Sequence, residues 1–331
     1  MDLRTTYMGF ELDNPLVVGA SPLSDDVSMV ERLVEAGASA IVMHSLFKEQ
    51  ITREQIAAHE DMDFLADSHA EALSYFPDED DYALGPQEYL EQITKLKEAV
   101  DVPVIGSLNG IAGGDWTSWA KLFQEAGADG IELNVYYLPL DGDESSGEVE
   151  QRFLDILTQV KACSDLPVAM KIASYFSSPV HMARRLSEAG ADALVLFNRL
   201  FHPDIDIDGL EIHPTLTLSH PGILNERLLW LAAMRDKVNL SLAVSGGVHD
   251  VEDVIKSVMA GADAVQMTSA LLRLGPQHLR QVRSQLKTWL EEHEYNSLQQ
   301  MTGSMSLLRC PEPESYERAN YIQSLQRWRN K

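Results

Sequence analysis

The sequence predicts an α/β fold in which eight strand and helix units close into a (β/α)8 barrel, and a repeated phrase is the main observation behind this prediction. Each copy ends an amphipathic stretch with a glycine, which readily adopts the left-handed conformation of a helix C-terminus, and an apolar stretch follows. The copies are EAGASA at 35–40, EAGADG at 125–130, EAGADA at 188–193 and MAGADA at 259–264. Their glycines are 90, 63 and 71 residues apart, which is about two units of roughly 30 residues, so the copies mark every second unit.

The length and composition fit one large domain. The 331 residues suit a TIM barrel, which commonly runs to about 250 residues or more, and a hydrophobic content of 45% supplies the core. We therefore expect a single barrel domain over residues 1–331. The chain starts without a signal-peptide pattern and has no uncharged apolar run of about 20 residues, which favours a cytoplasmic protein with no membrane association.

The charge and the cysteine content exclude several classes of ligand. The formal net charge of -25 repels nucleic acid and provides no polybasic patch for a membrane surface, but it is compatible with a cationic partner protein. Cys163 and Cys310 are too few for a disulfide framework and lack metal-ligand spacing, so we expect reduced thiols. The acidic clusters at 78–81 and 141–144 fit solvated loops better than a metal site, and we expect no metal.

Eight short segments rich in β-branched and aliphatic residues are the predicted barrel strands, as expected for parallel strands that are buried on both faces. They lie at 16–21, 40–45, 103–108, 130–135, 167–172, 193–198, 241–246 and 264–269. Most of the stretches between them have a helical pattern, for example DVEDVIKSVMAGA after the seventh strand. Strands and helices are therefore expected to alternate along the whole chain.

Three segments are expected to extend the barrel. Residues 1–13 contain LRTTYMGFEL, which alternates around a Met-Gly turn and predicts a β-hairpin before the first strand. The long connection after the second strand holds an insertion at 46–86, which we interpret as a lid because the loops on that face of a barrel build active sites. Residues 294–331 contain a proline break and then a helical pattern, so a C-terminal helical extension is expected to pack on the barrel or on a second subunit.

The ends of the seventh and eighth strands predict a phosphate site, and the pattern HDVEDV starts a helix just after the seventh. The residues at these two ends are Ser245, Gly246, Gly247, Gln266, Thr268 and Ser269. Paired glycines let backbone N–H groups approach an anion, and hydroxyl groups and a helix N-terminus add donors and positive potential. Barrels often bind phosphate after these strands, so we expect these residues to bind a cofactor. Glycines in a tight turn are the alternative interpretation.

Polar residues end other strands in a way that a purely structural barrel does not need. They are Ser21, His44, Ser45, Ser107, Asn109, Asn134, Lys171 and Asn198. A flat heterocycle with several donors and acceptors would satisfy such groups. Lys171 is the most informative, because a buried ammonium favours an electron-rich group such as N1 and O2 of a reduced flavin. An ion pair with Glu132, which alternation places on the same face as Asn134, is the structural alternative.

Several strand motifs together resemble one known family. They are GAS in the first strand, ELN in the fourth, the lone Lys171 in the fifth, Asn198 in the sixth, SGGV in the seventh and QMTSALL in the eighth. Over essentially its whole length the chain resembles the dihydroorotate dehydrogenase family of FMN-dependent barrels, particularly the soluble class 1 members. The resemblance implies an FMN cofactor and an oxidoreductase that acts on CH–CH bonds.

The resemblance also implies roles for individual residues. The FMN phosphate would be held by Gly246, Gly247, Thr268 and Ser269. The isoalloxazine or its chain would contact Lys171 and Asn109, with Ala20 and Ser21 against the ring. Asn134 and Asn198 would match asparagines that hydrogen-bond the pyrimidine substrate.

The catalytic base of the resembled family is replaced in this chain. Where the family continues its fourth strand into a stretch like NxSCPN, with a cysteine or serine as base, this chain reads NVYYLP, and Tyr137 takes the place of the base. Cys163 lies back in a helical stretch and cannot replace it. An ordinary tyrosine, with a pKa of about 10, is a poor base at neutral pH but a reasonable acid, so Tyr137 suits protonation of a carbanion or enolate.

Two further departures surround the second strand. Met43 stands where the family usually has a lysine facing flavin and substrate, and residues 74–77 read SYFP in place of a segment like NSMGLPN that helps to hold orotate. His44 offers a general acid or base nearby, although a histidine at a strand end is more often a structural hydrogen-bonder. Substrate recognition is therefore expected to differ from that of the family.

Three functions remain open from the sequence. The leading hypothesis is FMN-dependent hydride transfer through flavin N5 to or from a small planar or unsaturated carbonyl substrate, with dihydroorotate and orotate among the candidates. The second is a non-redox barrel isomerase or lyase with a phosphorylated substrate, which has no need of Lys171 beside paired asparagines. The third is a flavin-binding subunit whose acidic loops dock an electron-transfer protein. A homodimer, common in the resembled family, is compatible with the barrel and its extension.

Overall fold

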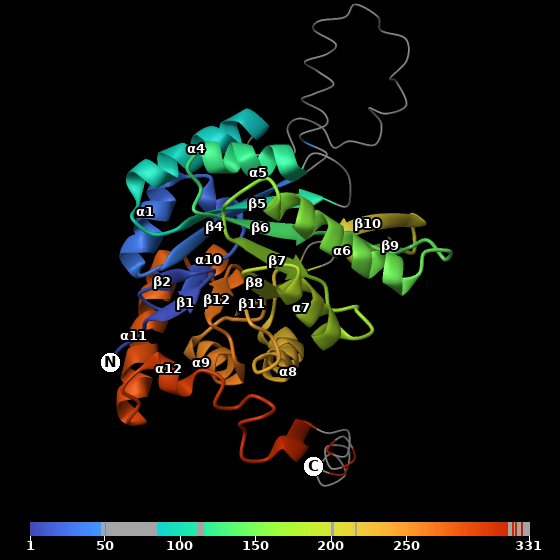
Figure 1. Ribbon diagram of the computed structural model, residues 1–331. Helices are drawn as coiled ribbons and strands as arrows, with labels where there is room; N and C mark the ends of the chain where they lie inside the picture. Colours follow the sequence, from blue (N-terminus) through green and yellow to red (C-terminus); the bar gives the residue numbers. More distant parts are fainter. Residues whose placement is uncertain are drawn as a thin grey trace, which may run out of the picture.

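The computed structural model of the protein describes residues 1–47, 50, 85–110, 116–199, 202–215, 217–316, 320, 322 and 326. Its centre is a closed barrel of eight parallel strands in the order β11-β12-β3-β4-β5-β6-β7-β8 (Figure 1). The strands are β3 (Leu16–Val18), β4 (Ala40–Phe47), β5 (Val104–Gly110), β6 (Gly130–Val135), β7 (Val168–Ile172), β8 (Ala193–Leu196), β11 (Ser241–Ser245) and β12 (Ala264–Met267). Each of them occupies a predicted strand segment, so the predicted (β/α)8 barrel is confirmed.

Helices cover the outside of the barrel (Figure 1). They are α1 (Val27–Ala36), α4 (Pro86–Ala99), α5 (Trp116–Glu125), α6 (Ser146–Lys161), α7 (Pro179–Glu188), α8 (Leu224–Met234), α9 (Val251–Ala260), α10 (Ser269–Leu274) and α11 (Pro276–Glu292), with short 3-10 turns η1 (Pro22–Ser24) and η3 (Pro221–Ile223). Alternate strand residues form an outer apolar layer against the helices and a smaller cluster inside the barrel, which includes Val17, Val42 and Ala169. The core is therefore built in two concentric layers.

The glycines of the repeated phrase end helices, as predicted. All four have positive φ, between 92° and 130°. The alanine after each glycine donates its N–H to the carbonyl five residues earlier, which is the closure expected of a left-handed helix cap. The phrase therefore stops each helix and turns the chain toward the next strand.

The aspartate in three copies of the phrase joins strands to helices. Each carboxylate accepts a hydrogen bond from the backbone N–H at the start of the preceding strand and pairs with a basic side chain at or just after the end of the helix before that strand. The ion pairs are Lys97–Asp129, Lys161–Asp192 and Arg235–Asp263. These contacts lie at the N-terminal end of the barrel, where residues serve stability rather than chemistry.

The predicted N-terminal hairpin is present and covers the N-terminal end of the barrel. β1 (Thr5–Tyr7) and β2 (Phe10–Leu12) pair antiparallel around the predicted Met-Gly turn. Tyr7 and Leu12 are buried in the cluster inside the barrel. The hairpin therefore supplies the lowest layer of the barrel interior.

The predicted insertion and C-terminal extension are described only in part. β4 continues to Phe47 and α4 begins at Pro86, so the lid expected at 46–86 lies almost wholly outside the described residues and stays a prediction. In the extension, α12 (Leu298–Met301) and η4 (Pro313–Tyr316) follow α11. The expected terminal helix falls mostly beyond the described part of the chain.

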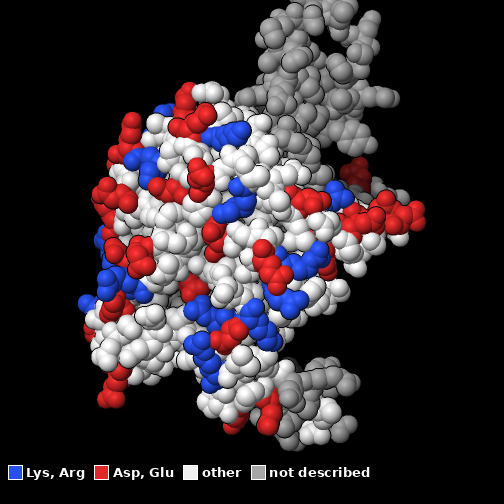
Figure 2. Space-filling model, in the orientation of Figure 1, with Lys and Arg blue, Asp and Glu red and all other residues white. Residues whose placement is uncertain are grey.

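An antiparallel hairpin between β8 and α8 was not predicted. β9 (His202–Asp206) pairs with β10 (Glu211–Thr215), and the pair projects from the side of the barrel where the strands end (Figure 1). Ile205 and Ile212 are exposed on it, and Figure 2 shows acidic side chains gathered there. The alternating DIDID is a strand signal, but the prolines and aspartates around it favour a loop.

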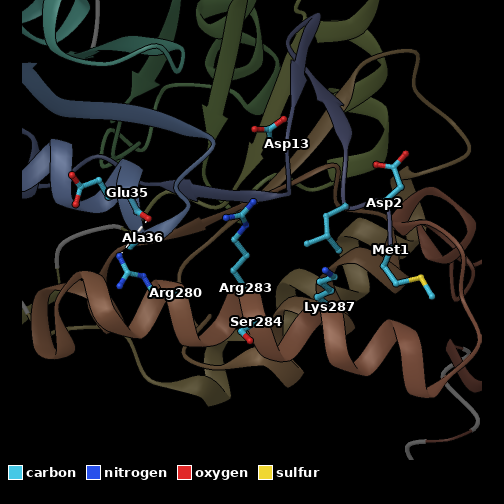
Figure 3. A pocket seen from close by; sticks show the side chains of 10 residues that line it. Met1, Asp2, Asp13, Glu35, Ala36, Arg280, Arg283, Ser284 and Lys287 are labelled. Atoms are coloured by element: carbon cyan, nitrogen blue, oxygen red, sulfur yellow. Dashed lines mark hydrogen bonds between the residues drawn. The ribbon is translucent and has the colours of Figure 1, made fainter.

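A surface cavity of about 680 Å3 lies at the N-terminal end, between α11, α1 and the start of the chain (Figure 3). Arg280, Arg283 and Lys287 line it across from Asp13 and Glu35. Because the chemistry of a barrel is carried by the opposite end, this cavity is not assigned to the active site. In the described residues, three or more histidine, cysteine or acidic side chains nowhere gather as a metal site. No described helix is long and apolar enough to cross a membrane.

Candidate functional site

The C-terminal ends of β5, β6, β7 and β8 bring together the predicted amide and ammonium groups. Asn109, Asn134 and Lys171 are in-register neighbours on three adjacent strands, and each is 7% exposed. Asn198, just beyond β8, donates its side-chain amide to Oδ1 of Asn134 at 2.5 Å. Four residues predicted from separate strand ends therefore form one polar row, in which Asn198 is half-buried and the other three are buried.

Lys171 lies against a fully buried carboxylate. Its Nζ is 3.1 Å from Oε1 of Glu132, so the ion pair that alternation indicated is present. Oε2 of Glu132 accepts a hydrogen bond from Nε2 of Gln266 at 2.6 Å. An ammonium has three N–H donors, and Glu132 is the one acceptor found for Lys171 within the described residues, so donors remain for a further acceptor.

Gln266 lies deeper in the barrel than the strand-end prediction implied. It is 1% exposed and lies beside Tyr7 of the N-terminal hairpin, where burial raises the pKa of the Tyr7 phenol. Its amide holds Glu132 from below. Its Oε1 has no hydrogen-bond partner within the described residues, so direct contact of Gln266 with a ligand stays a prediction.

The strand β4 has a register shift just where the resembled family places its lysine. Val42 belongs to the cluster inside the barrel, while Met43 packs in the outer layer against the helices. Met43 therefore does not face the site, and the expectation that it replaces a flavin-facing lysine is wrong. After the shift, the Ser45 and Ser107 hydroxyls lie 2.8 Å apart on neighbouring strands. A local irregularity of this kind re-aims side chains beside a barrel rim.

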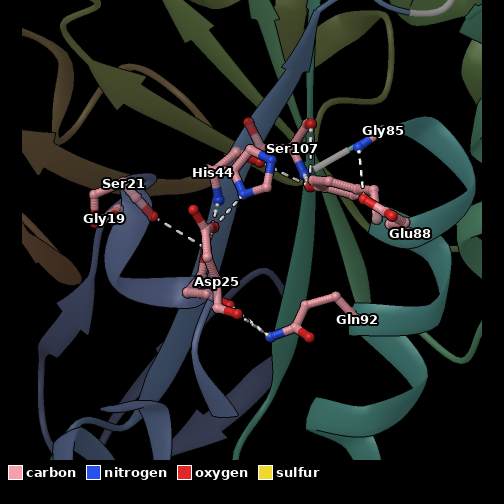
Figure 4. A network of polar contacts seen from close by, with 10 residues as sticks. Gly19, Ser21, Asp25, His44, Gly85, Glu88, Gln92 and Ser107 are labelled. Atoms are coloured by element: carbon pink, nitrogen blue, oxygen red, sulfur yellow. Dashed lines mark hydrogen bonds and ion pairs between the residues drawn. The ribbon is translucent and has the colours of Figure 1, made fainter. Parts of the chain in front are cut away.

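His44 is held by the segment after β3 and by α4 (Figure 4). Its Nδ1 lies 2.6 Å from Oδ1 of Asp25, and its ring meets Tyr89 edge to face with 4.9 Å between centroids. Its backbone N–H donates to Oγ of Ser24, and Gln92 of α4 donates to the Asp25 carbonyl. These contacts fix the loop after β3, which favours the structural interpretation of His44 over general acid-base catalysis.

The GAS motif of the first strand lies where β3 approaches β12. A Cβ atom at Gly19 would be 2.5 Å from Oγ1 of Thr268, so this position accepts only glycine. The Ser21 hydroxyl donates to the Gly19 carbonyl at 3.0 Å, and Ala20 is half-buried between them. The motif therefore places Thr268 and the Ala20–Ser21 backbone side by side on the strand-end face, which is the end of the barrel formed by the C-terminal ends of its strands.

The predicted glycine pair after β11 has backbone donors to spare. Gly246 and Gly247 both have φ of 85°, which side chains rarely adopt. A Cβ atom at Gly247 would be 2.7 Å from the backbone nitrogen of Leu224. Neither glycine N–H donates to a protein acceptor within the part of the chain that the structure describes. This is the arrangement expected where an anion supplies the missing acceptor.

The helix expected to strengthen this phosphate site carries acidic residues at its own start. The carboxylate of Asp253, in the first turn of α9, accepts hydrogen bonds from the N–H groups of His249 and Asp250, and Asp250 caps Asp253 in return. These carboxylates occupy three of the N–H donors around the start of α9 and offset part of the positive end of the helix dipole. The contribution of the α9 N-terminus to a phosphate site stays a prediction. Ser269, by contrast, stays beside the site, where its hydroxyl accepts the Ser219 N–H at 3.0 Å.

Tyr137 lies in the loop between β6 and α6. Its hydroxyl donates to Glu144 at 2.5 Å, Arg152 donates to the same carboxylate at 2.6 Å, and the Arg152 guanidinium lies 4.3 Å from the Tyr137 ring centroid. Tyr175 donates its hydroxyl to the Tyr137 carbonyl. The hydrogen bond to Glu144 raises the pKa of the Tyr137 phenol, which keeps it protonated and suits an acid. Within the described residues, the Tyr137 side chain makes no hydrogen bond to Asn134.

Several partners of the site residues were not predicted. They are Asp25, Glu144, Arg152 and Arg227. Glu144 ends the acidic cluster at 141–144, whose first three residues are exposed as a solvated loop should be. A charged residue shortly after a barrel strand is a signal that could have marked Asp25 and Glu144. Arg152 and Arg227 gave no such signal, because a charge inside a helical pattern usually faces solvent.

Comparison with known proteins agrees with this geometry. Residues 82–290, more than half of the chain, match the family model described as dihydroorotate dehydrogenase. The dihydroorotate dehydrogenase B (NAD(+)) catalytic subunit of Thermoplasma volcanium is 27% identical over 308 residues, which cover 91% of this chain and 98% of that protein. The NAD-dependent dihydropyrimidine dehydrogenase subunit PreA of Escherichia coli is 24% identical over 321 residues, which cover 91% of this chain and 76% of that protein. The barrel, its polar strand ends and these matches show that the protein belongs to the dihydroorotate dehydrogenase family of oxidoreductases.

Proposed function

We propose that the protein is an FMN-dependent oxidoreductase that transfers a hydride to or from a small planar, unsaturated carbonyl compound. The observation that carries this proposal is the buried ammonium of Lys171, which shares its carboxylate with Gln266 and keeps free donors beside Asn134. Burying an ion costs several kcal/mol of desolvation free energy, so the buried Lys171–Glu132 pair contributes little to the stability of the barrel. An electron-rich ring at the strand ends is the acceptor that fits it.

The residues at the strand ends fit FMN. The free N–H groups of Gly246 and Gly247 would hold the phosphate together with Thr268 and Ser269. Lys171 and Asn109 would bind the ring system, because both are buried in the row beside it. FMN, when bound, supplies a group that accepts or gives a hydride at N5. The protein's own contribution is to orient the ring, exclude water and bind the substrate.

The asparagine pair favours a planar substrate with adjacent donors and acceptors. In the hydrogen bond from Asn198 to Asn134, the Asn134 Nδ2 group and the Asn198 Oδ1 atom are left for a ligand. An amide or imide edge offers the complementary carbonyl and N–H groups, and dihydroorotate and orotate are candidates. The sequence differs from that of the family after β4, at residues 74–77, and after β6, at Tyr137. These differences support a substrate that differs from dihydroorotate and orotate around the reacting carbon.

Tyr137 is the proposed proton donor. Its phenol stays protonated beside Glu144, and the Arg152 guanidinium over its ring would stabilise the phenolate that forms once the proton has moved to the substrate carbon. The direction in which this residue works best is therefore reduction of an unsaturated substrate. His44, bound to Asp25 and Tyr89, would support the loop after β3 and leave the proton transfer to Tyr137.

The proposal extends to partners. The two relatives described above are named as subunits of larger enzymes, and we propose that an electron-transfer protein likewise exchanges electrons with this chain, which itself forms a homodimer. The net charge of -25 favours a cationic docking surface on that protein. Light scattering of the purified chain is expected to give the mass of two chains, and a monomer at micromolar concentration would remove the dimer from the proposal.

The cofactor proposal is tested by purification and spectroscopy. The purified protein is expected to be yellow, to show a flavin absorption spectrum, and to release FMN rather than FAD on denaturation. A colourless protein that does not bind added FMN would contradict the proposed function. A non-redox isomerase or lyase would then be the better account of the barrel.

The substrate class is tested separately with reduced protein. After photoreduction without oxygen, the protein is mixed with orotate, fumarate and a panel of unsaturated carbonyl compounds, and reoxidation of the flavin is followed by absorbance. Rapid reoxidation by one planar carbonyl compound is the expected result. Reoxidation by none of them, together with reoxidation by an electron-transfer protein, would contradict the substrate assignment while leaving the cofactor assignment intact.

A further inference from the structure

Arg227 is a buried arginine beside the end of β11 that has no role in the proposed hydride and proton transfer. It lies in the first turn of α8, and its side chain is 6% exposed. Its Nε donates to the Ser245 carbonyl at 2.6 Å, and its Nη1 donates to the Ile223 carbonyl at 2.9 Å. The guanidinium is thereby held in one orientation at the end of β11, directly before the glycine pair.

The charge of this guanidinium is poorly balanced by the protein. The carboxylate beside it, that of Glu226, is 3.7 Å away and half exposed to solvent. Burial lowers the pKa of Arg227, and the nearby cation Arg199 lowers it further, while Glu226 acts in the opposite direction. A buried cation with a second cation near it and a solvated carboxylate as its partner is unfavourable unless an anion binds.

The free edge of the guanidinium faces the glycine pair. Nη2 of Arg227 makes no hydrogen bond within the described residues, and it lies 3.3 Å from the point where a Cβ atom of Gly246 would be. A side chain at Gly246 would therefore separate Arg227 from the turn. Glycine at this position keeps the guanidinium and the free N–H groups of the turn within reach of one ligand.

To bind a phosphate, the Gly246–Gly247 turn needs a positive charge from outside α9, the helix that follows it. The Asp253 carboxylate in the first turn of α9 already accepts the N–H groups of His249 and Asp250, and its negative charge offsets part of the helix dipole that would attract a dianion. Basic side chains gather over the face of the barrel near α7 and α8 in Figure 2, although the protein as a whole is acidic. Arg227 is the basic residue of α8, and it is buried and reaches the turn.

We propose that Arg227 binds the phosphate of the flavin and makes this site selective for FMN over riboflavin, an inference that rests on the proposed function. A guanidinium bound to a phosphate oxygen forms a charge-assisted hydrogen bond, which is stronger than the neutral bonds from the glycine N–H groups. The phosphate in turn supplies the negative charge that the buried arginine lacks. Arg227 thus acts as a binding residue and takes no part in hydride or proton transfer.

The test compares flavin binding by flavin-stripped wild-type protein and by Arg227→Gln. The variant is expected to bind FMN about ten to a hundredfold more weakly, which corresponds to the loss of one charge-assisted bond, and to bind riboflavin as the wild type does. Arg184→Gln is the matched control, because Arg184 is exposed on α7 and pairs with Glu188 at 3.5 Å. Equal weakening of both flavins would show a structural role and overturn the proposal, as would unchanged FMN affinity.

Inorganic phosphate provides a second readout that needs no flavin. Phosphate is expected to raise the thermal midpoint of the flavin-stripped wild type and of Arg184→Gln, but not that of Arg227→Gln. Equal stabilisation of all three proteins would overturn the role of Arg227. If the wild type binds neither flavin, the proposed function fails, and the phosphate measurement still decides whether Arg227 belongs to an anion site.

Discussion

The two halves of the strand-end face differ in how far their polar groups are already satisfied. On the side of β11, β12 and β3, glycines expose backbone N–H groups that have no acceptor within the described chain, and Arg227 adds a free guanidinium edge. On the side of β4, β6 and β8, side chains bind one another, as in the pairs Asn198–Asn134, Tyr137–Glu144 and His44–Asp25. The first half therefore has free donors for an anion, whereas the polar side chains of the second half mostly bind one another.

This difference explains which features of the resembled family persist. The motifs on the cofactor side depend on glycines whose φ angles and close neighbours admit no other residue, so they tolerate little change. The contacts on the proposed substrate side are made by side chains, and such residues can be substituted without altering the barrel. Lys171 lies on β7, between β6 and β8 of the second half, and its partner Glu132 also binds Gln266 of β12 in the first half.

The largest effect is expected for Lys171→Met. Removing the ammonium leaves Glu132 buried and unpaired, so the free energy of unfolding should fall by about 3–5 kcal/mol, and hydride transfer should be lost. Denaturant unfolding and single-turnover kinetics measure the two effects. The double variant Lys171→Met with Glu132→Gln removes both charges and is expected to recover most of the stability but none of the activity. Recovery of activity in the double variant would contradict a ligand role for Lys171.

The next largest effect is expected for Tyr137→Phe on the substrate side. Removing a proton donor should slow substrate reduction about a hundredfold or more, with FMN binding unchanged. Tyr175→Phe is the matched control, because its hydroxyl contacts the Tyr137 carbonyl rather than a reacting group. If Tyr137→Phe turns over at the rate of this control, Tyr137 has no part in proton transfer and serves only to hold the loop.

A smaller effect is expected for Gly247→Ala on the cofactor side. The left-handed backbone strain of about 1–2 kcal/mol adds to the contact of the new Cβ with Leu224, so the loss of stability should be about 2 kcal/mol or more, together with weaker FMN binding. Gly9→Ala in the N-terminal hairpin has a similar φ of 83° but open space around it, so it should show the backbone strain alone. Equal FMN affinity in both variants would argue against a phosphate at the Gly246–Gly247 turn.

The smallest effect is a shift in pH dependence. The hydrogen bond to Glu144 raises the pKa of Tyr137, and an acid loses activity as the pH rises through its pKa. Glu144→Gln removes the carboxylate while Arg152 remains, so the pKa of Tyr137 should fall and the alkaline limb of the pH–rate profile should move to lower pH. Glu148→Gln, which changes only the cap of α6, is the control. An unmoved alkaline limb would show that another group supplies the proton.

The fold was predictable because its determinants are local and repeated. The glycine, alanine and aspartate of the repeated phrase each have a distinct function at the end of a helix, and all of them are adjacent in the sequence. The N-terminal hairpin followed from one alternating stretch in the same way. The hairpin of β9 and β10 was missed because its two strands are short and exposed, so they lack the apolar pattern that marks a buried strand.

The site was predictable residue by residue but not as a set of contacts. Strand periodicity placed Asn109, Asn134 and Lys171 correctly, since a barrel fixes where strand ends meet. The resemblance failed at Met43, because Ile41 packs in the outer layer and Val42 inside the barrel, so regular alternation already turns Met43 outward. Strand periodicity could not reveal Arg227, whose role depends on the approach of α8 to β11, two elements that only the closed barrel brings together.

The central claim is that the strand-end face binds FMN, with the phosphate at the Gly246–Gly247 turn. The most direct measurement is a calorimetric titration of flavin-stripped protein with FMN and with riboflavin. The account predicts one FMN bound per chain and a clearly weaker affinity for riboflavin. Equal affinity for the two flavins would contradict the phosphate site, and no heat with either of them would contradict the flavin site itself.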